Sequence, residues 1–346
     1  MAGSQENDNS QNGLYQSTKS PDSTFLGIYT TNGVENSKGR SSDRESLYIR
    51  THFNRYRFQQ AAHSMLAIEG KKKFELGEID HPLNIHRTAK CMRVRFKKAV
   101  GVHKSKKHKR AFYSKLVVCG NVFTCPVCAA KIQERRRLEI AKLFDAAYGG
   151  VFGAKKKVVM VTFTFSHSRE DKLFDLMEAQ NKALKVLRKT DSWKEMKSRF
   201  GFAGFVRSLE VTYGINGWHP HTHEALVVDP DTDVEELREL LVKQWLRICT
   251  RFGLAGDKTD DFIKRSVCIT DNCHASSYLA KQDSSRNWGI DRELAKSMTK
   301  QGKKSGRHPF SFLKDYVEGD KKAAALYLEY VFGMRNQNGK TRRQIQ

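Results

Sequence analysis

The sequence predicts an α+β fold in which a central antiparallel sheet is flanked by helices. Segments rich in β-branched residues alternate with longer segments whose apolar residues recur at helical spacing. Two predicted strands are separated by Asn216-Gly217, a dipeptide typical of tight hairpin turns. Strands that are joined both by a hairpin and by helices are typical of a layered α+β arrangement.

The composition predicts a globular protein with a polyanionic partner. The chain has 346 residues, of which 39% are apolar and 29% are charged, and its formal net charge is +24. Its apolar runs fall short of the roughly 18 residues of a membrane span, and its N-terminus lacks the pattern of a signal peptide. We therefore expect a cytoplasmic protein with no membrane partner. The positive charge favours nucleic acid as that partner.

The first part of the chain is predicted to hold a tail and a basic helical segment. Residues 1–45 are rich in Ser, Asn, Gln, Gly and Asp, so we expect a disordered tail. Helices are predicted over 47–70 and 129–150, the second ending on a pair of glycines. The predicted organisation is a basic helical segment at 46–150, a second domain at 151–335 and a basic tail at 336–346.

The second domain is predicted to contain the sheet. Helical spacing of Leu173, Leu176, Met177, Leu184 and Leu187 predicts one of its helices. The remaining elements follow from β-branched density, helical periodicity and glycine stops. They are strands at 156–166, 202–214, the histidine-rich stretch that ends at 228, and 262–270, with further helices at 234–253, 274–282 and 321–334.

A strongly basic stretch precedes the second helix. Residues 93–115 contain ten Lys or Arg and no acid, and the aromatic residues Phe96, Phe112 and Tyr113 lie between the basic residues. A solvated basic loop is one interpretation, but the aromatic residues favour a ribbon that contacts phosphates. The residues that we expect to bind DNA are Lys104, Lys106, Lys107, Lys109 and Arg110.

Four of the seven cysteines lie in one region of the sequence. Cys125 and Cys128 form a C-x₂-C pair, with Cys119 shortly before it. This clustering favours a metal over disulfides, and Cys91 would complete a tetrahedral Cys₄ zinc site. His103 and His108 are alternatives for the fourth ligand. A structural zinc here would fix the basic loop.

Three histidines alternate along the strand that follows Asn216-Gly217. Side chains alternate between the faces of a strand, so His219, His221 and His223 share one face. If Asn216-Gly217 is a two-residue turn, Glu210 lies opposite His223 and Thr212 lies opposite His221. The other face carries apolar residues of both strands and is expected to form the core: Phe205, Leu209, Val211, Tyr213, Leu226 and Val228.

This arrangement predicts a metal site. An exposed polar face is the alternative, but three imidazoles in alternation opposite a carboxylate are more typical of metal ligands. Two histidines and a carboxylate suit Mg²⁺, Mn²⁺, Zn²⁺ or, as a facial triad, Fe²⁺. The basic charge favours a cation that polarises a phosphate, with Mg²⁺ or Mn²⁺ expected.

The stretch "GWHPHTHEALVV" resembles the metal-binding motif of the HUH endonucleases. Its His-Pro-His-x-His form is similar to that of replication initiators (Rep proteins) of small rolling-circle plasmids, whose CPxC segment also lies upstream. The resemblance, over roughly 85–335, implies an HUH nuclease domain with a central RRM-like sheet at 151–335. It implies that His221 and His223 are ligands, while the register nominates Glu210 as a third. His219 is expected to orient them, to touch the phosphate or to be a further ligand.

The resemblance also implies a nucleophile in "SSYLAKQD". Tyr278, with Lys281 one turn later, matches the Tyr-x-x-Lys arrangement of the family. The implied chemistry is attack of the phenolate on a DNA phosphodiester, which leaves a 5′-phosphotyrosyl link and a free 3′-hydroxyl. Many relatives carry an acid about one turn before the tyrosine. Position 274 is His here, so how the intermediate is resolved stays open.

The expected function is initiation of rolling-circle replication by nicking and joining single-stranded DNA. The expected partners are the double-strand origin of a plasmid, its single-stranded hairpin, and a host helicase and polymerase. Two alternatives remain. An HUH relaxase or transposase would share the chemistry, whereas a zinc-dependent DNA-binding regulator would not be an enzyme.

Overall fold

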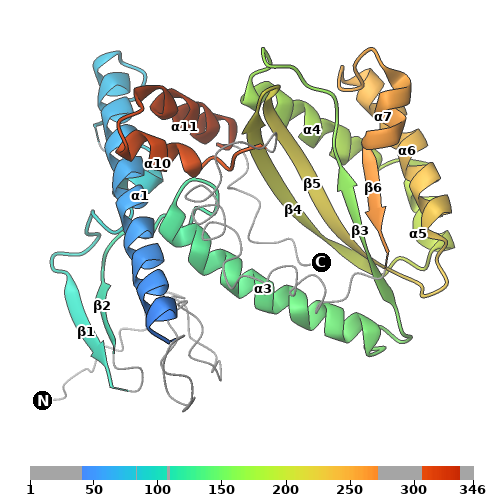
Figure 1. Cartoon of the computed structure of the whole chain (residues 1–346), viewed down its shortest axis with the longest axis horizontal. Helices are drawn as coiled ribbons and strands as arrows, with labels where there is room; N and C mark the ends of the chain where they lie inside the picture. The colour runs from blue at the N-terminus through green and yellow to red at the C-terminus, as the bar shows by residue number, and fades with distance from the viewer. Residues whose placement is uncertain (1–40, 83, 107–109, 272–305, 336–346) are drawn as a thin grey trace, which may run out of the picture.

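The computed structural model describes residues 41–82, 84–106, 110–271 and 306–335 (Figure 1). A long helix, α1 (Ser41–Glu75), precedes the short α2 (Arg87–Lys90) and a two-stranded ribbon of β1 (Gly101–Ser105) and β2 (Arg110–Ser114). The helix predicted at 47–70 is thus longer at both ends. Residues 1–40 of the expected tail lie outside the described residues, whereas residues 41–45 of that tail are helical.

The helix that follows the cysteines is α3 (Pro126–Tyr148). Pro126 occupies its first turn, where a missing N–H costs no helical hydrogen bond. Gly150, the second glycine of the predicted stop, takes the left-handed φ of +80°. In Figure 1, α3 runs from beside α1 to the far end of the sheet, with the ribbon at the opposite end of the molecule from the sheet.

A four-stranded antiparallel sheet occupies the second half of the chain, as the sequence predicts. Its strands are β3 (Lys157–Phe163), β4 (Gly204–Gly214), β5 (Gly217–Val228) and β6 (Val267–Thr270). Their order is β4-β5-β3-β6, so the histidine-bearing strand β5 is central and has a neighbour on each side. The chain is therefore a mixed α+β protein with antiparallel sheets and helices.

One face of the sheet packs on helices α4 (Leu173–Leu187) and α6 (Val234–Arg251). The apolar residues expected at helical spacing in α4 are all buried. Asp233 caps α6 by accepting from the backbone N–H groups of Glu235 and Glu236. The same core extends to α1, α10 (Ser311–Val317) and α11 (Lys321–Gly333), which confirms the helix predicted near Lys321.

The opposite face of the sheet carries the three alternating histidines. One part of this face is covered, because Phe144 and Ala147 of α3 pack against Val158, Ala225 and Val227. The histidine end lies beyond this cover and is half-buried. The sheet therefore has one face that is part of the main core and one that is closed only at one end.

The predicted register of the β4–β5 hairpin is wrong. The turn residues are Ile215 and Asn216, and Gly214 pairs with Gly217. A type I′ turn needs positive φ at both central residues, but only Gly217, with φ +81°, has it here. The pairing is displaced by two residues, so Glu210 lies opposite His221 rather than His223. Because the displacement is even, every side chain keeps its predicted face.

The strand predicted at 262–270 is also partly wrong. Its first half is helix α7 (Thr259–Arg265), which has Asp260 and Asp261 in the first turn and buries Phe262. Only Val267–Thr270 pairs, with β3. Helices α5 (Asp191–Arg199) and α10 were not predicted. The helix predicted at 274–282 lies outside the described residues.

A short segment before α10 extends the sheet at its β4 edge. Arg307 and Tyr213 exchange two backbone hydrogen bonds, of 2.8 and 2.9 Å. Gly306 lies so close to Thr212 that an added Cβ would be 2.6 Å from the threonine Oγ1. This pairing brings His308 next to the strand that carries Glu210. In the described part of the chain, no helix is both long and apolar enough to cross a membrane.

Candidate functional site

Glu210, His221 and His223 converge on the open part of the histidine face. The Glu210 Oε2 lies 3.2 Å from the His223 Nε2 and 3.4 Å from the His221 Nε2. One ligand atom from each of the three residues lies within 4.8 Å of the others. Despite the error in register, β4 and β5 thus bring together the three side chains that the sequence nominated.

The outer nitrogens of both imidazoles have partners of their own. The His221 Nδ1 lies 3.3 Å from the backbone oxygen of His219, and the His223 Nδ1 lies 2.9 Å from the Thr162 Oγ1. A carbonyl oxygen only accepts, so the His221 Nδ1 carries a proton. Its Nε2 faces the Glu210 carboxylate, and a cation bound between the two would take the place of a proton on that nitrogen.

The charge state of Glu210 also suits a cation. Hydrogen bonds from His221 and His223 hold the pKa of this carboxyl group well below its usual range. Glu210 is therefore a carboxylate throughout the physiological pH range. Two imidazole nitrogens and a carboxylate are suitable ligands for a divalent cation, and the half-exposed position leaves room for a further ligand.

His219 lies on the same face but belongs to a different contact. Its Nδ1 is 2.6 Å from the Nε2 of His167, whose Nδ1 is 3.1 Å from the backbone oxygen of Asn216. Its ring centroid is 4.9 Å from that of His221. Burial lowers the pKa of His219 to about 4, so it is neutral at pH 7.

Two histidines of this region were not predicted from the sequence. His167 follows β3, and His308 precedes α10, so neither belongs to a recognisable motif. The His308 Nδ1 accepts a hydrogen bond of 3.2 Å from the backbone N–H of Phe310. Burial lowers the pKa of His308 to about 4, although the nearby Glu210 carboxylate opposes the shift.

The predicted nucleophile cannot be placed against this cluster. Tyr278, Lys281 and His274 all lie between residues 272 and 305, outside the described residues. Their roles remain predictions.

The four cysteines named from the sequence form a buried cluster. Sγ separations are 3.6 Å for Cys91–Cys128, 3.6 Å for Cys119–Cys128 and 3.9 Å for Cys91–Cys125. A zinc ion about 2.3 Å from four sulfurs at tetrahedral angles gives sulfur separations of about 3.8 Å. The cluster therefore fits zinc. Cys91 is the fourth member, whereas His103 lies on the ribbon and His108 lies outside the described residues.

Neighbouring N–H groups point at the sulfurs. The side-chain amide of Gln59, on α1, lies 3.4 Å from the Cys125 Sγ. The backbone N–H of Cys119 lies 3.5 Å from the Cys91 Sγ, and that of Asn121 lies 3.5 Å from the Cys119 Sγ. Such donors stabilise thiolates. The cluster also links α1, the base of the ribbon and the N-terminus of α3.

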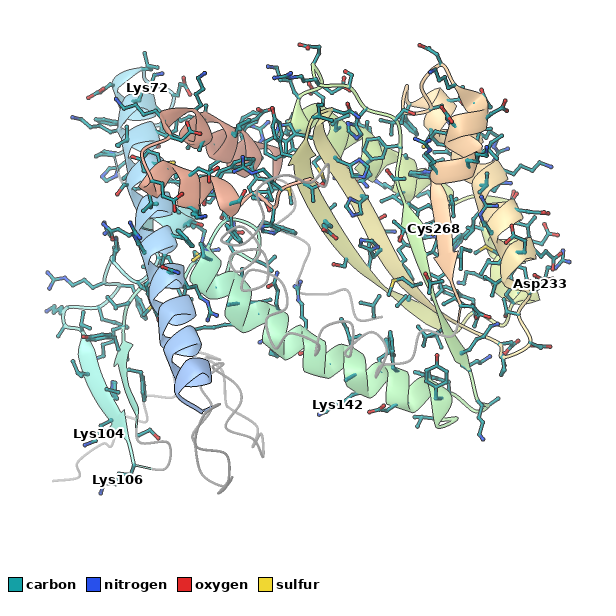
Figure 2. The ribbon with its side chains drawn as sticks, in the orientation of Figure 1. Lys72, Lys104, Lys106, Lys142, Asp233 and Cys268 are labelled. Carbon is teal, nitrogen blue, oxygen red and sulfur yellow. The ribbon has the colours of Figure 1, made fainter. Side chains whose placement is uncertain are left out.

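The basic stretch forms the β1–β2 ribbon between the first two cysteines of this cluster. Lys104 and Lys106 are exposed near its free end (Figure 2). Lys107 and Lys109 lie outside the described residues, and Arg110 begins β2. The backbone thus agrees with the ribbon that the sequence favoured over a loop.

Comparison with known proteins supports the resemblance seen in the sequence. Residues 90–248 match the model of a family described as replication protein. This range includes the cysteine cluster, the ribbon and the Glu210, His221 and His223 triad. Through residues 90–248, the chain is therefore similar to the replication-protein family.

Two curated relatives of the chain come from Streptomyces. "Protein rep" of Streptomyces lividans is 32% identical over 158 residues, which cover 37% of this chain and 33% of the relative. "Neomycin resistance protein" of Streptomyces cyanogenus is 29% identical over 145 residues, and the match covers 34% of this chain and 32% of the relative. The chain thus spans about a third of the length of each curated relative. No solved structure matches it significantly.

Proposed function

We propose that this chain initiates rolling-circle replication of a plasmid by nicking and joining single-stranded origin DNA. The observation that carries the proposal is the convergence of Glu210, His221 and His223 on a half-open sheet face. A net charge of +24 supports a DNA substrate, and the replication-protein family supports the biological role. The proposal includes an HUH nuclease domain with an RRM-like sheet, acting in the cytoplasm.

Each residue of the proposed site has a distinct task. Glu210, His221 and His223 would hold Mg²⁺ or Mn²⁺, with His219 beside them. The bound cation would polarise a non-bridging oxygen of the scissile phosphate. Glu210 contributes negative charge at pH 7, and the outer contacts of His221 and His223 fix the orientation of their rings.

The proposed nucleophile is the phenolate of Tyr278. Its oxygen forms a bond to phosphorus, and the bond from phosphorus to the 3′-oxygen breaks. The leaving oxygen takes up a proton and becomes the 3′-hydroxyl that a polymerase extends. Lys281 would stabilise the phenolate, since an unassisted tyrosine has a pKa of about 10. The 5′-phosphotyrosyl link conserves the energy of the phosphodiester for rejoining.

The other features of the chain have supporting roles in this proposal. The Cys91, Cys119, Cys125 and Cys128 cluster would bind a structural zinc. Lys104, Lys106, Lys107, Lys109 and Arg110 would contact DNA phosphates at the origin. A host helicase and polymerase would then act on the nicked plasmid.

A cleavage assay tests the proposal. The full chain is incubated with Mn²⁺ and a labelled single-stranded hairpin from the origin of its own replicon. We expect a denaturation-resistant protein–DNA adduct, which Tyr278→Phe abolishes without loss of binding. His221→Ala and His223→Ala should also prevent cleavage, with at most partial rescue by excess metal. Tyr316→Phe is the matched tyrosine control.

The same assay separates the alternatives. A DNA-binding regulator would shift the oligonucleotide without cutting it, and that result would overturn the proposal. A relaxase or transposase would cut transfer-origin or transposon-end hairpins in preference to the replication origin. Full cleavage by Tyr278→Phe would show that the nucleophile is a different residue.

A further inference from the structure

The β1–β2 ribbon exposes large apolar side chains. Val102 is 70% exposed, Tyr113 is 60% exposed and Phe112 is 52% exposed. Soluble proteins seldom leave such a cluster in water without a partner. Figure 2 shows Lys104 and Lys106 at the end of the ribbon that points away from the rest of the molecule.

Both faces of the ribbon carry such side chains. Val102 lies opposite Tyr113 on one face, and Lys104 follows on that face. His103 lies opposite Phe112 on the other face, where their rings stack with centroids 5.1 Å apart. A partner that fits the ribbon must therefore contact two faces rather than one.

The charge of this segment indicates a polyanion. Between Cys91 and Cys119 the sequence contains no Asp or Glu. The Lys and Arg residues of this segment whose side chains are described are Arg93, Arg95, Lys97, Lys98, Lys104, Lys106 and Lys115. This uninterrupted positive charge favours a nucleic acid over a protein surface of mixed charge.

We infer that the ribbon enters the major groove of duplex DNA. The major groove is about 12 Å wide and admits a two-stranded β-ribbon. In that position Val102 and Tyr113 contact base edges, including thymine methyl groups, while the lysines contact phosphates. A single-stranded partner would instead stack its bases on Phe112 and Tyr113, and the single-strand probe below tests that alternative. The inference rests on the proposed function, because it gives the origin duplex its binding surface.

The base of the ribbon is held firmly enough to direct it. The backbone hydrogen bond from Met92 to Val117 measures 2.7 Å, and that from Val117 to Val94 measures 2.8 Å. Cys91 and Cys119, at the two ends of this hairpin, meet in the cysteine cluster. Isolated hairpins are marginally stable in water, so this anchor fixes the direction in which the ribbon projects.

Binding measurements with the zinc-loaded full chain test the inference. Fluorescence anisotropy compares three labelled probes across a range of salt concentrations: the origin duplex, an unrelated duplex and the single strand of the origin. We expect Tyr113→Ala to weaken origin-duplex binding about tenfold while unrelated duplex changes little. Lys104→Ala should weaken both duplexes and reduce the salt slope by about one.

The control is Phe152→Ala, because Phe152 is a 43% exposed aromatic residue on the loop after α3. Zinc content and circular dichroism verify that each variant is folded. The inference is overturned if Tyr113→Ala weakens only single-strand binding, or if it changes no affinity. Phe152→Ala should bind all three probes and cleave the single-stranded hairpin as the wild type does. Failure of the wild type to cleave would contradict the proposed function, yet leave the duplex comparison interpretable.

Discussion

The Nε2 of His167 lies 2.6 Å from the Nδ1 of His219, beside the candidate cation ligands. His167 must donate from its Nδ1 to the backbone oxygen of Asn216, because a carbonyl oxygen only accepts. Its Nε2 is therefore an acceptor, and His219 must donate from Nδ1. This chain of hydrogen bonds leaves a lone pair on the His219 Nε2, the form that a metal or a proton donor requires.

Replacing His167 should therefore disturb the site without removing any of the three converging side chains. We expect His167→Ala to weaken Mn²⁺ binding or slow cleavage about 10- to 100-fold, the usual effect of losing an outer contact. His167→Gln should recover part of this loss, since an amide can donate to Asn216 and accept from His219. Isothermal titration and single-turnover cleavage measure the two effects. His81→Ala, at an exposed position, is the control, and wild-type values for His167→Ala would contradict the assignment.

Glu210→Gln tests the charge of the candidate metal site. The substitution keeps the shape of the side chain but removes the negative charge between His221 and His223. We expect Mn²⁺ affinity to fall by at least about tenfold and cleavage to fall with it. Glu178→Gln, which changes an exposed residue of α4, should bind Mn²⁺ as the wild type does. Unchanged Mn²⁺ affinity in Glu210→Gln would exclude this residue as a ligand.

The cysteine cluster predicts that the purified chain contains one equivalent of zinc. Removing it with a chelator, or replacing Cys125 with Ser, should lower the thermal unfolding midpoint, because α1, the ribbon and α3 meet at the cluster. Elemental analysis and calorimetry provide the measurements. Cys249→Ser, outside the cluster, should keep full zinc content. A metal-free chain with an unchanged midpoint would rule out a structural zinc.

A buried cluster of charged residues, on the sheet face opposite the histidines, should contribute to stability rather than to catalysis. Glu224 is fully buried and pairs with both Arg188 and Arg207. Glu224→Gln removes the charge that balances two poorly hydrated guanidinium groups. We expect the free energy of unfolding to fall by about 3–5 kcal/mol in urea titrations. The exposed Glu178→Gln should change it by less than about 0.5 kcal/mol.

His86 predicts an acid-sensitive helix cap. Its Nδ1 accepts from the backbone N–H of Thr88 at 3.2 Å, and burial lowers its pKa to about 4. In the unfolded chain the His86 ring takes up a proton near pH 6.5, whereas in the folded chain it does so only near pH 4. The cap therefore makes its full contribution to the free energy of unfolding above pH 6.5, and this contribution is lost as the pH falls toward 4. His86→Asn retains a capping acceptor without titrating, so its unfolding free energy should fall less over this range. Urea titrations at several pH values measure this free energy, and an equal fall with pH in the wild type and in His86→Asn would contradict the prediction.

The sequence predicts the sheet and the faces of its strands well, because alternation and β-branched density are local properties. The hairpin register could not be obtained in the same way. Asn216-Gly217 is compatible both with a type I′ turn and with a turn in which only the glycine is left-handed, and packing decides between them. The residues predicted for the metal site nevertheless lie together, because a displacement by two residues leaves every side chain on its predicted face.

Residues that reach a site through tertiary structure gave no sequence signal. His167 and His308 come from a loop and a short edge segment, and each is a lone histidine in the sequence. Glu224 directly follows His223 in the sequence, yet it lies on the opposite face of the strand and is buried with two arginines. By contrast, the C-x₂-C spacing carried enough information to identify two further cysteines of the same cluster.

The helix α3 has a geometric consequence for origin DNA. It begins at the cysteine cluster that fixes the ribbon and ends against the sheet that carries the histidines, and it contains 23 residues. At about 1.5 Å per residue it is about 34 Å long, close to one turn of B-form DNA. Under the proposed function, a rigid spacer of this length would fix the phase between the recognised base pairs and the nick. An origin with half a helical turn of DNA inserted between the recognised base pairs and the nick site would then be cut poorly. Insertion of a whole turn would return the nick site to the same side of the duplex as the recognised base pairs.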